Sequence, residues 1–263
     1  MKLQIVDATL RDGSHAVRHA FTVPQAREIA GRLDRCNVPI IEVSHGDGLG
    51  GSSYTYGFSR EDPFSLIAAA AESVSQAKIS VLLLPGIGTI SDLAHAKDCG
   101  ASIVRVATHV TEADISAQHI QAAKSMGLMS VGFLMMVHML DPDGIAEQAK
   151  KMESYGADYI NLADSAGALL PGQVAARIQA VRAAVKIPVG FHAHNNLSLA
   201  VANSLAAIDA GASYIDATLL GLGAGAGNTQ MEVLAGVLQR KGIETGLDFY
   251  GLIDASEQAV API

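Results

Sequence analysis

The stretch LQIVDATLRDGSH, residues 3–15, changes from an apolar, β-rich run to charged and imidazole side chains. A second stretch, IPVGFHAHNN at residues 187–196, changes in the same way. His192 and His194 are two residues apart, so on a β-strand both side chains point to the same side. A nearby carboxylate such as Asp12 would complete a three-ligand site for a divalent metal, with positions left open. Both stretches therefore predict metal-binding or catalytic side chains at the C-terminal ends of strands.

Eight short runs rich in Val and Ile recur along the chain. They are nearly continuous in apolar character, which is typical of parallel strands covered on both faces. These expected strands are residues 3–9, 40–45, 79–84, 103–108, 130–136, 158–163, 188–194 and 214–219. Helix-like segments lie between them, at residues 24–33, 63–75, 115–124, 145–155, 171–185 and 198–210, and one more is expected in the tail at residues 247–260. Glycines at positions 100, 127, 156 and 211 are expected to end helices just before strands.

Eight alternating strand–helix units predict an α/β fold of the (β/α)8 TIM-barrel type. The length of 263 residues suits one such barrel, and we expect residues 1–263 to form a single domain. The tetrapeptide DATL occurs twice, at residues 7–10 and 216–219, at the ends of the first and last strands. This echo indicates either shared strand chemistry or a trace of duplication.

Composition excludes several classes of protein. The net charge of −8 argues against nucleic-acid binding and against anionic membrane surfaces. No apolar run reaches the roughly 18 residues of a membrane span, and the N-terminus lacks the apolar core of a signal peptide. The two cysteines, Cys36 and Cys99, are far apart and form no CxxC motif. We therefore expect a reduced, cytoplasmic enzyme.

The residues beside the expected metal ligands have chemistry of their own. Arg11 is always charged and forked, which suits an enolate or carboxylate oxygen, although it could instead form a salt bridge with a barrel carboxylate such as Glu42. Both roles are compatible, because Glu42 would then orient the arginine. His15 has a near-neutral reference pKa and is a candidate base, the alternative being a surface loop histidine.

Two further polar residues have open assignments. Ser165 follows the sixth expected strand and either binds a substrate carboxylate or caps a turn. Asn228, after the eighth strand, either caps the last barrel helix or lies near the metal. Mixed nitrogen and oxygen ligation suits Mn²⁺, Mg²⁺, Co²⁺, Fe²⁺ or Zn²⁺. No lysine is expected at the barrel mouth, so Schiff-base catalysis is disfavoured and a metal is expected to act as the electron sink.

Several motifs together resemble a known family. TLRDG at residues 9–13 with HAHN at residues 192–195 is similar to the metallolyase barrels of hydroxymethylglutaryl-CoA lyase and isopropylmalate synthase. Those branches usually have Gln where this chain has His15. The histidine resembles instead the 4-hydroxy-2-oxovalerate aldolases, as do four further motifs: HGDGLGGSS at residues 45–53, LPGIGT at 84–89, RVATH at 105–109 and GFLMM at 132–136. The resemblance runs from residue 5 to about residue 258.

The resemblance implies reversible cleavage of 4-hydroxy-2-oxopentanoate to pyruvate and acetaldehyde. It implies that Asp12, His192 and His194 bind a divalent metal, usually Mn²⁺, with Mg²⁺ or Co²⁺ as alternatives. It also implies that His15 takes the proton of the 4-hydroxyl, that Arg11 stabilises the enolate, and that Ser165, Arg11, Asp12 and His192 contact the substrate. The expected substrates are thus small 2-oxo acids and aldehydes.

One departure from the family pattern concerns the C-terminal segment. Family members usually continue for several dozen residues, which supply an active-site tyrosine and pack on an acylating aldehyde dehydrogenase. The given chain ends at Ile263, so binding of that partner is doubtful, and an oligomer is left open. The competing predictions are another lyase or an acyl-CoA-using synthase of the same superfamily, and a barrel that binds a metal or partner without catalysis.

Overall fold

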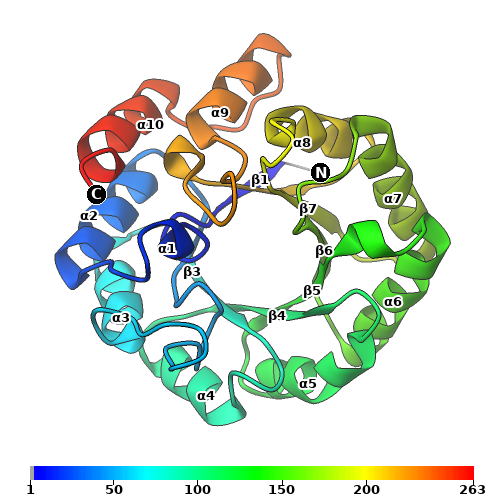
Figure 1. The fold of residues 1–263 in the computed structure, drawn as a ribbon, viewed down its shortest axis with the longest axis horizontal. Helices are drawn as coiled ribbons and strands as arrows, with labels where there is room; N and C mark the ends of the chain where they lie inside the picture. The colour runs from blue at the N-terminus through cyan, green and yellow to red at the C-terminus, as the bar shows by residue number, and fades with distance from the viewer. Residues whose placement is uncertain (1–2) are drawn as a thin grey trace.

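The computed structural model describes residues 3–263, and its eight strands form one closed parallel barrel (Figure 1). Each strand pairs with the next, and β1 closes the barrel against β8 with Gln4 opposite Tyr214. The strands are β1 (Gln4–Asp7), β2 (Ile40–Glu42), β3 (Lys78–Leu83), β4 (Ile103–His109), β5 (Met129–Met135), β6 (Tyr159–Asp164), β7 (Val189–Ala193) and β8 (Tyr214–Ala217). The predicted (β/α)8 barrel is confirmed.

Helices surround the barrel and cover the outer face of its strands (Figure 1). They are α1 (Gly13–Ala16), α2 (Val23–Arg35), α3 (Pro63–Ser73), α4 (Ile90–Asp98), α5 (Ala117–Ser125), α6 (Pro142–Tyr155), α7 (Pro171–Ala184), α8 (Ala200–Asp209), α9 (Met231–Arg240) and α10 (Phe249–Ala255), which a π-type turn continues over Ser256–Val260. The single turn α1 was not expected from the sequence and lies over the barrel mouth (Figure 1).

Local sequence sets the ends of these helices. Thr22 and Gln25 form a reciprocal capping box at the start of α2, and Asp141 accepts a backbone hydrogen bond from Gly144 at the start of α6. The four glycines predicted to end helices, at positions 100, 127, 156 and 211, all have positive φ angles between 76° and 105°. This left-handed conformation stops a helix and is favoured by glycine.

The interior of the barrel is built in layers. At the N-terminal end, the even-numbered strands contribute an apolar layer of Ile40, Ile103, Tyr159 and Tyr214, in which the two tyrosine rings stack 4.0 Å apart. Near the C-terminal end, a second apolar cluster contains Leu82, Ala107, Phe133 and Ala163. Side chains two residues apart on a strand point to the same face, so the positions between these two layers also face the interior.

The middle layer of the barrel is polar and charged. Its four members come from the same even-numbered strands and are Glu42, Arg105, Asn161 and Asp216, none more than 2% exposed. Branched apolar side chains dominate such layers in most barrels. A buried charged layer directly beneath the mouth therefore indicates that the chemistry of this protein reaches into the barrel interior. Within residues 3–263, no helix combines the length and the apolar character needed to cross a bilayer.

Candidate metal and substrate site

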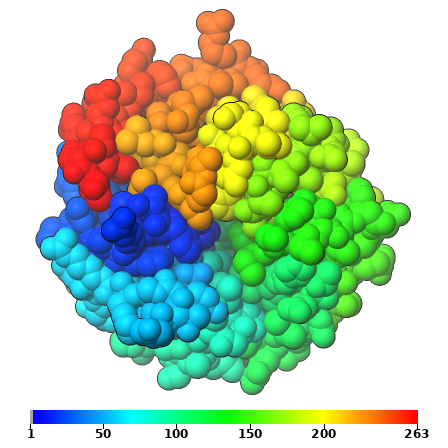
Figure 2. Space-filling model, in the orientation of Figure 1, coloured from blue at the N-terminus to red at the C-terminus, as the bar shows by residue number. Residues whose placement is uncertain are grey.

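The segment after β1 brings three predicted site residues to the mouth. Asp7 ends the strand, and its carboxylate accepts hydrogen bonds from the backbone N–H and the hydroxyl of Thr9, at 2.9 and 2.7 Å. The turn that follows holds Arg11 and Asp12, and α1 begins directly after it and holds His15, so that all three line the cavity at the mouth. Figure 2 shows this face of the molecule hollowed at its centre, where the dark blue β1–α1 segment meets the orange β8–α9 loop.

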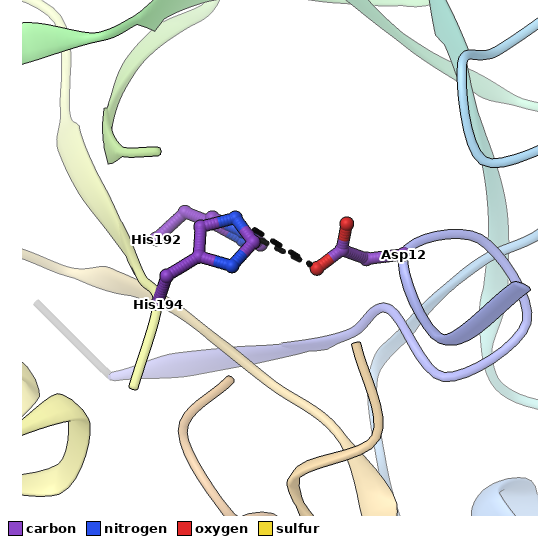
Figure 3. A group of neighbouring side chains, drawn as sticks. All are labelled: Asp12, His192 and His194. Atoms are coloured by element: carbon purple, nitrogen blue, oxygen red, sulfur yellow. Dashed lines mark hydrogen bonds and ion pairs between the residues drawn. The ribbon is translucent and has the colours of Figure 1, made fainter. Parts of the chain in front are cut away.

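Three donor atoms converge above the end of β7. The Nε2 atoms of His192 and His194 are 3.3 Å apart, and they are 3.8 and 3.9 Å from Oδ2 of Asp12 (Figure 3). Such spacings suit donors that share one ion at the usual bond lengths of roughly 2.0–2.2 Å. The structure thus brings together the residues that the sequence predicted as metal ligands.

The Nδ1 atoms of the two imidazoles are already engaged, which leaves the Nε2 atoms as the possible metal donors. Nδ1 of His192 lies 2.8 Å from Oδ2 of Asp216, and Nδ1 of His194 lies 3.3 Å from the carbonyl oxygen of Ala224. Both oxygens are acceptors, so we assign the proton of each neutral ring to Nδ1. Both Nε2 lone pairs then face a carboxylate oxygen with no proton between them. A cation resolves this repulsion, and the donor set therefore fits a divalent metal.

Burial and neighbouring charges keep Asp12 and His194 in the protonation states that a metal needs. Burial alone would raise the pKa of Asp12, but the Arg11 guanidinium and the two imidazoles hold it well below its usual range. Burial, together with neighbouring His192, lowers the pKa of His194 to about 4. At neutral pH the site thus presents an anionic carboxylate and a neutral His194 imidazole.

Asp12 is fixed by two donors. Nη1 of Arg11 donates to Oδ1 at 3.0 Å, and Nδ2 of Asn228 donates to Oδ2. Asn228 therefore lies beside the candidate ligand, whereas the N-cap position of α9 is occupied by Gln230. Gly223 lies so close that a Cβ atom there would be 2.4 Å from Nδ2 of Asn228 and 2.9 Å from Oδ2 of Asp12. Only glycine allows the β8–α9 loop to approach the site in this way.

Glu42, in the middle layer of the barrel, orients Arg11. Its Nε donates to Oε2 of Glu42 at 2.7 Å, as the sequence predicted, and the Arg11 residue is only 5% exposed. Its Nη2 is buried and has no hydrogen-bond partner within residues 3–263. A buried guanidinium N–H without a partner is costly unless a ligand accepts from it. The arginine is therefore held rigidly with one donor available.

His15 lines the cavity and lies over the backbone of the β2–α3 loop. A Cβ atom at Gly46 would come within 2.6 Å of the His15 ring, so a glycine is required there. His15 is half-buried and lines the cavity with Asp47. It is therefore accessible from the cavity, in contrast to a histidine in a solvent-exposed loop.

The cavity at the mouth has a volume of about 220 Å³, below the roughly 300–1,000 Å³ of sites for drug-sized ligands. Its apolar wall comes from β3, β5 and β6, and its lining side chains include Leu82, Leu84, Phe133, Met135 and Ala163. Ser165 also lines it, and the Ser165 hydroxyl accepts a hydrogen bond of 3.1 Å from the backbone N–H of Met136. Its proton thus remains available to an acceptor in the cavity.

A second group of donors, His15, His19 and Asp47, also clusters near the mouth. Nδ1 of His19 is occupied by the hydroxyl of Ser14 at 3.0 Å, and its ring stacks on His45 at 3.7 Å. All three members of this second group are only half-buried, whereas Asp12 and His192 are buried, so the group around Asp12 is the stronger metal candidate.

Of the residues that support the site from inside the barrel, Glu42 was expected from the sequence, whereas Arg105, Asn161 and Asp216 were not. Asp216 accepts the hydrogen bond of His192, and Arg105 joins Asp216 to Glu42. The available signal was a polar residue in the middle of each even-numbered apolar strand, at positions 42, 105, 161 and 216.

The family model and the similar curated proteins agree on one family for this chain. The family model described as HMGL-like matches residues 2–259. The 4-hydroxy-2-oxovalerate aldolase of Moorella thermoacetica is 60% identical over 99% of this chain and 77% of its own length. The protein of the same name from Thermus thermophilus is 58% identical over 98% of this chain and 75% of its own length.

Solved structures share the same fold. The HMG-CoA lyase of Brucella melitensis has a TM-score of 0.84 at 22% identity, covering 100% of this chain and 99% of its own. The carboxyl transferase domain of Rhizobium etli pyruvate carboxylase has a TM-score of 0.85 at 20% identity, covering 97% of this chain and 47% of its own. At these identities the likeness concerns the barrel alone.

The donor geometry generates a prediction about Asp12. We expect Asp12→Asn to weaken Mn²⁺ binding, measured by electron paramagnetic resonance of the free ion, by more than the roughly 10–100-fold typical of an outer-shell partner. Asp47→Asn is the matched control, because it removes a carboxylate from the same cavity. Equal losses in both variants would contradict a specific ligand role for Asp12, and a loss in Asp47→Asn alone would place the ion in the second group.

Proposed function

Because the chain belongs to the HMGL-like family, we propose that its barrel mouth performs the reaction named for the 4-hydroxy-2-oxovalerate aldolases that it matches at 57–60% identity. By this homology it is an aldolase, a carbon–carbon lyase. The reaction is the reversible cleavage of 4-hydroxy-2-oxopentanoate to pyruvate and acetaldehyde. The convergence of Asp12, His192 and His194 beside Arg11 and His15 is the observation that supports this assignment most directly.

Asp12, His192 and His194 would hold a divalent metal, for which we propose Mn²⁺, with Mg²⁺ and Co²⁺ as alternatives. When bound, such an ion supplies Lewis-acid stabilisation to the oxygen atoms of a 2-oxo acid. The protein residues fix the ligands before the ion arrives, through Asn228 and Arg11 on Asp12 and through Asp216 on His192. This preorganisation keeps the open side of the site directed at the cavity.

His15 would start the cleavage by accepting the proton of the substrate 4-hydroxyl. The C4–O bond then becomes the carbonyl of acetaldehyde, the C3–C4 bond breaks, and its electron pair enters the enolate of pyruvate. A proton returned to C3 completes pyruvate. A half-buried imidazole that opens on the cavity is placed for this exchange.

Arg11 would balance the negative charge that develops on the enolate oxygen. Glu42 fixes its orientation, and the N–H groups of its Nη2, which have no partner within residues 3–263, are left for that oxygen. Ser165, on the facing wall, would donate its hydroxyl hydrogen to the substrate carboxylate. The small cavity and its apolar wall on β3 and β5 suit a short 2-oxo acid and a small aldehyde.

Residues 1–263 would act as one aldolase domain, which we place in the cytoplasm, where Cys36 and Cys99 stay reduced. The curated relatives are longer, since the chain covers 75–78% of their length. Contact with an acylating aldehyde dehydrogenase stays a prediction.

The activity itself can be tested directly. With Mn²⁺ and 4-hydroxy-2-oxopentanoate, we expect pyruvate to form, detected as NADH loss with added lactate dehydrogenase. Chelation of the metal should stop the reaction. Thiol release from acetyl-CoA with a 2-oxo acid, in place of pyruvate formation, would favour the synthase alternative, and no turnover with any of the proposed metals would favour a non-catalytic barrel.

The role of His15 gives a second prediction. We expect His15→Ala to lower kcat for cleavage by roughly 10²–10⁴-fold, the usual contribution of a general base, while Mn²⁺ affinity stays unchanged. His19→Ala is the matched control, since it removes an imidazole four residues away that does not line the cavity. Normal turnover by His15→Ala would exclude His15 as the base.

The role of Arg11 gives a third prediction. We expect Arg11→Lys to lower kcat by up to roughly 10²–10³-fold, the effect of losing one oxyanion donor, because a point charge cannot replace the fork that contacts Glu42 and Asp12 at once. Mn²⁺ affinity should change much less. If the variant mainly loses the metal, Arg11 is a structural partner of Asp12.

A further inference from the structure

Arg105 lies in the charged middle layer of the barrel, between Glu42, which contacts Arg11, and Asp216, which contacts His192. It comes from β4, and it is completely buried. It does not line the cavity, from which the ring of Phe133 separates it at 4.4 Å between Cζ and the ring centroid. A guanidinium in this place contacts neither substrate nor the candidate metal ligands directly, so any role in the reaction must pass through its partners.

One side of Arg105 supports the substrate arginine. Its Nη1 donates to Oε2 of Glu42 at 3.0 Å. The same oxygen accepts the hydrogen bond from Nε of Arg11 at 2.7 Å. Glu42 is therefore held between two guanidiniums, and its position sets the direction of Arg11.

The other side of Arg105 supports the candidate metal ligand. Its Nη2 donates to Oδ2 of Asp216. That oxygen also accepts Nδ1 of His192 at 2.8 Å and Nδ2 of Asn161 at 3.2 Å. Asp216 thus orients the imidazole, and Arg105 orients Asp216.

We propose that Arg105 is a positioning residue that fixes Arg11 and His192 relative to each other through Glu42 and Asp216. This inference rests on the proposed function for its consequences in catalysis. The two groups must act on the same small substrate, one as donor to the enolate oxygen and the other as metal ligand. A shared rigid fork between their supporting carboxylates sets the relative placement of both groups.

An arginine is required for this role. Its planar fork presents several N–H donors in fixed directions and so reaches two carboxylates at once, whereas a lysine is a point charge on a flexible stem. The face of Phe133 packs on the guanidinium and restricts its plane. The Phe133 ring also meets the His192 ring edge-on, at 5.9 Å between centroids. Phe133 therefore forms an apolar link between Arg105 and His192.

A purely structural role makes a different prediction. Buried ion pairs are often replaced by apolar side chains of similar size with little loss of stability or even a gain. If Arg105 only fills the barrel, Arg105→Met should change the unfolding midpoint and nothing else. If it positions the site, the variant should change Mn²⁺ affinity and kcat even when the barrel folds well.

The test compares Arg105→Met and Arg105→Lys with two variants of its partners. We expect Arg105→Met to weaken Mn²⁺ binding by roughly 10–100-fold and to lower kcat by a similar factor, as for loss of outer-shell support. Asp216→Asn should affect mainly Mn²⁺ affinity, and Glu42→Gln mainly kcat. Arg105→Lys should lose unequal amounts of Mn²⁺ affinity and kcat, because a lysine ammonium can bond only one of Glu42 and Asp216 well.

The control is Asp34→Asn, which removes a buried carboxylate that binds the backbone of residues 75–77 away from the site. It should lower the unfolding midpoint while Mn²⁺ affinity and kcat stay within about twofold of wild type, well inside the range of an outer-shell loss.

Wild-type Mn²⁺ affinity and kcat in Arg105→Met would overturn this inference alone. If that variant does not fold, Arg105→Lys decides in the same way. A wild-type protein that binds no Mn²⁺ and forms no pyruvate would overturn the proposed function together with the inference.

Discussion

Two guanidiniums and two carboxylates form one connected group inside the barrel. The site at the mouth depends on the balance of these buried charges. Moving a single charge out of water costs several kcal/mol, which only close and well-bonded partners can offset. Arg11 and Arg105 meet at one oxygen of Glu42, and Arg105 continues to Asp216. These four charges cancel, and Asp12 adds one negative charge at the top of the group. A site that is neutral below and anionic at its open end is suited to a cation.

The layered interior explains why this balance forms where it does. An apolar layer with stacked Tyr159 and Tyr214 closes the N-terminal end, so water does not reach the charges from below. The cluster around Phe133 covers them from above and at the same time forms the cavity wall. The charges are therefore held in a medium of low polarity, in which each hydrogen bond is stronger and each lost partner is more costly. Rigid support of this kind is what a preorganised site requires.

The sequence was sufficient to predict the barrel and the convergence of Asp12, His192 and His194 at its mouth. Strand-like runs with glycines at the helix ends predict the fold, and His192 with His194 on one strand predicts a shared direction of both imidazoles. The charged layer could not be assembled in the same way. Arg105 and Asp216 are 111 positions apart in sequence, and they meet only because the closed barrel places their strands, β4 and β8, across from each other. Asn228 was ambiguous for a related reason, because its partner Asp12 is 216 positions away.

The repeated DATL segment shows how strongly register determines function. In the pairing of β1 with β8, Val6 lies opposite Asp216 and Asp7 lies opposite Ala217, so the two copies are offset by one residue. An offset of one places equivalent side chains on opposite faces of the sheet. Val6 and Asp216 face the interior, whereas Asp7 faces away, where it bonds Thr9, and burial raises its pKa to about 7. Burial would raise the pKa of Asp216 as well, but Arg105 and His192 lower it. The same four residues therefore yield a turn-stabilising carboxyl in one strand and an ionised anchor for a metal ligand in its neighbour, and the difference comes from register alone.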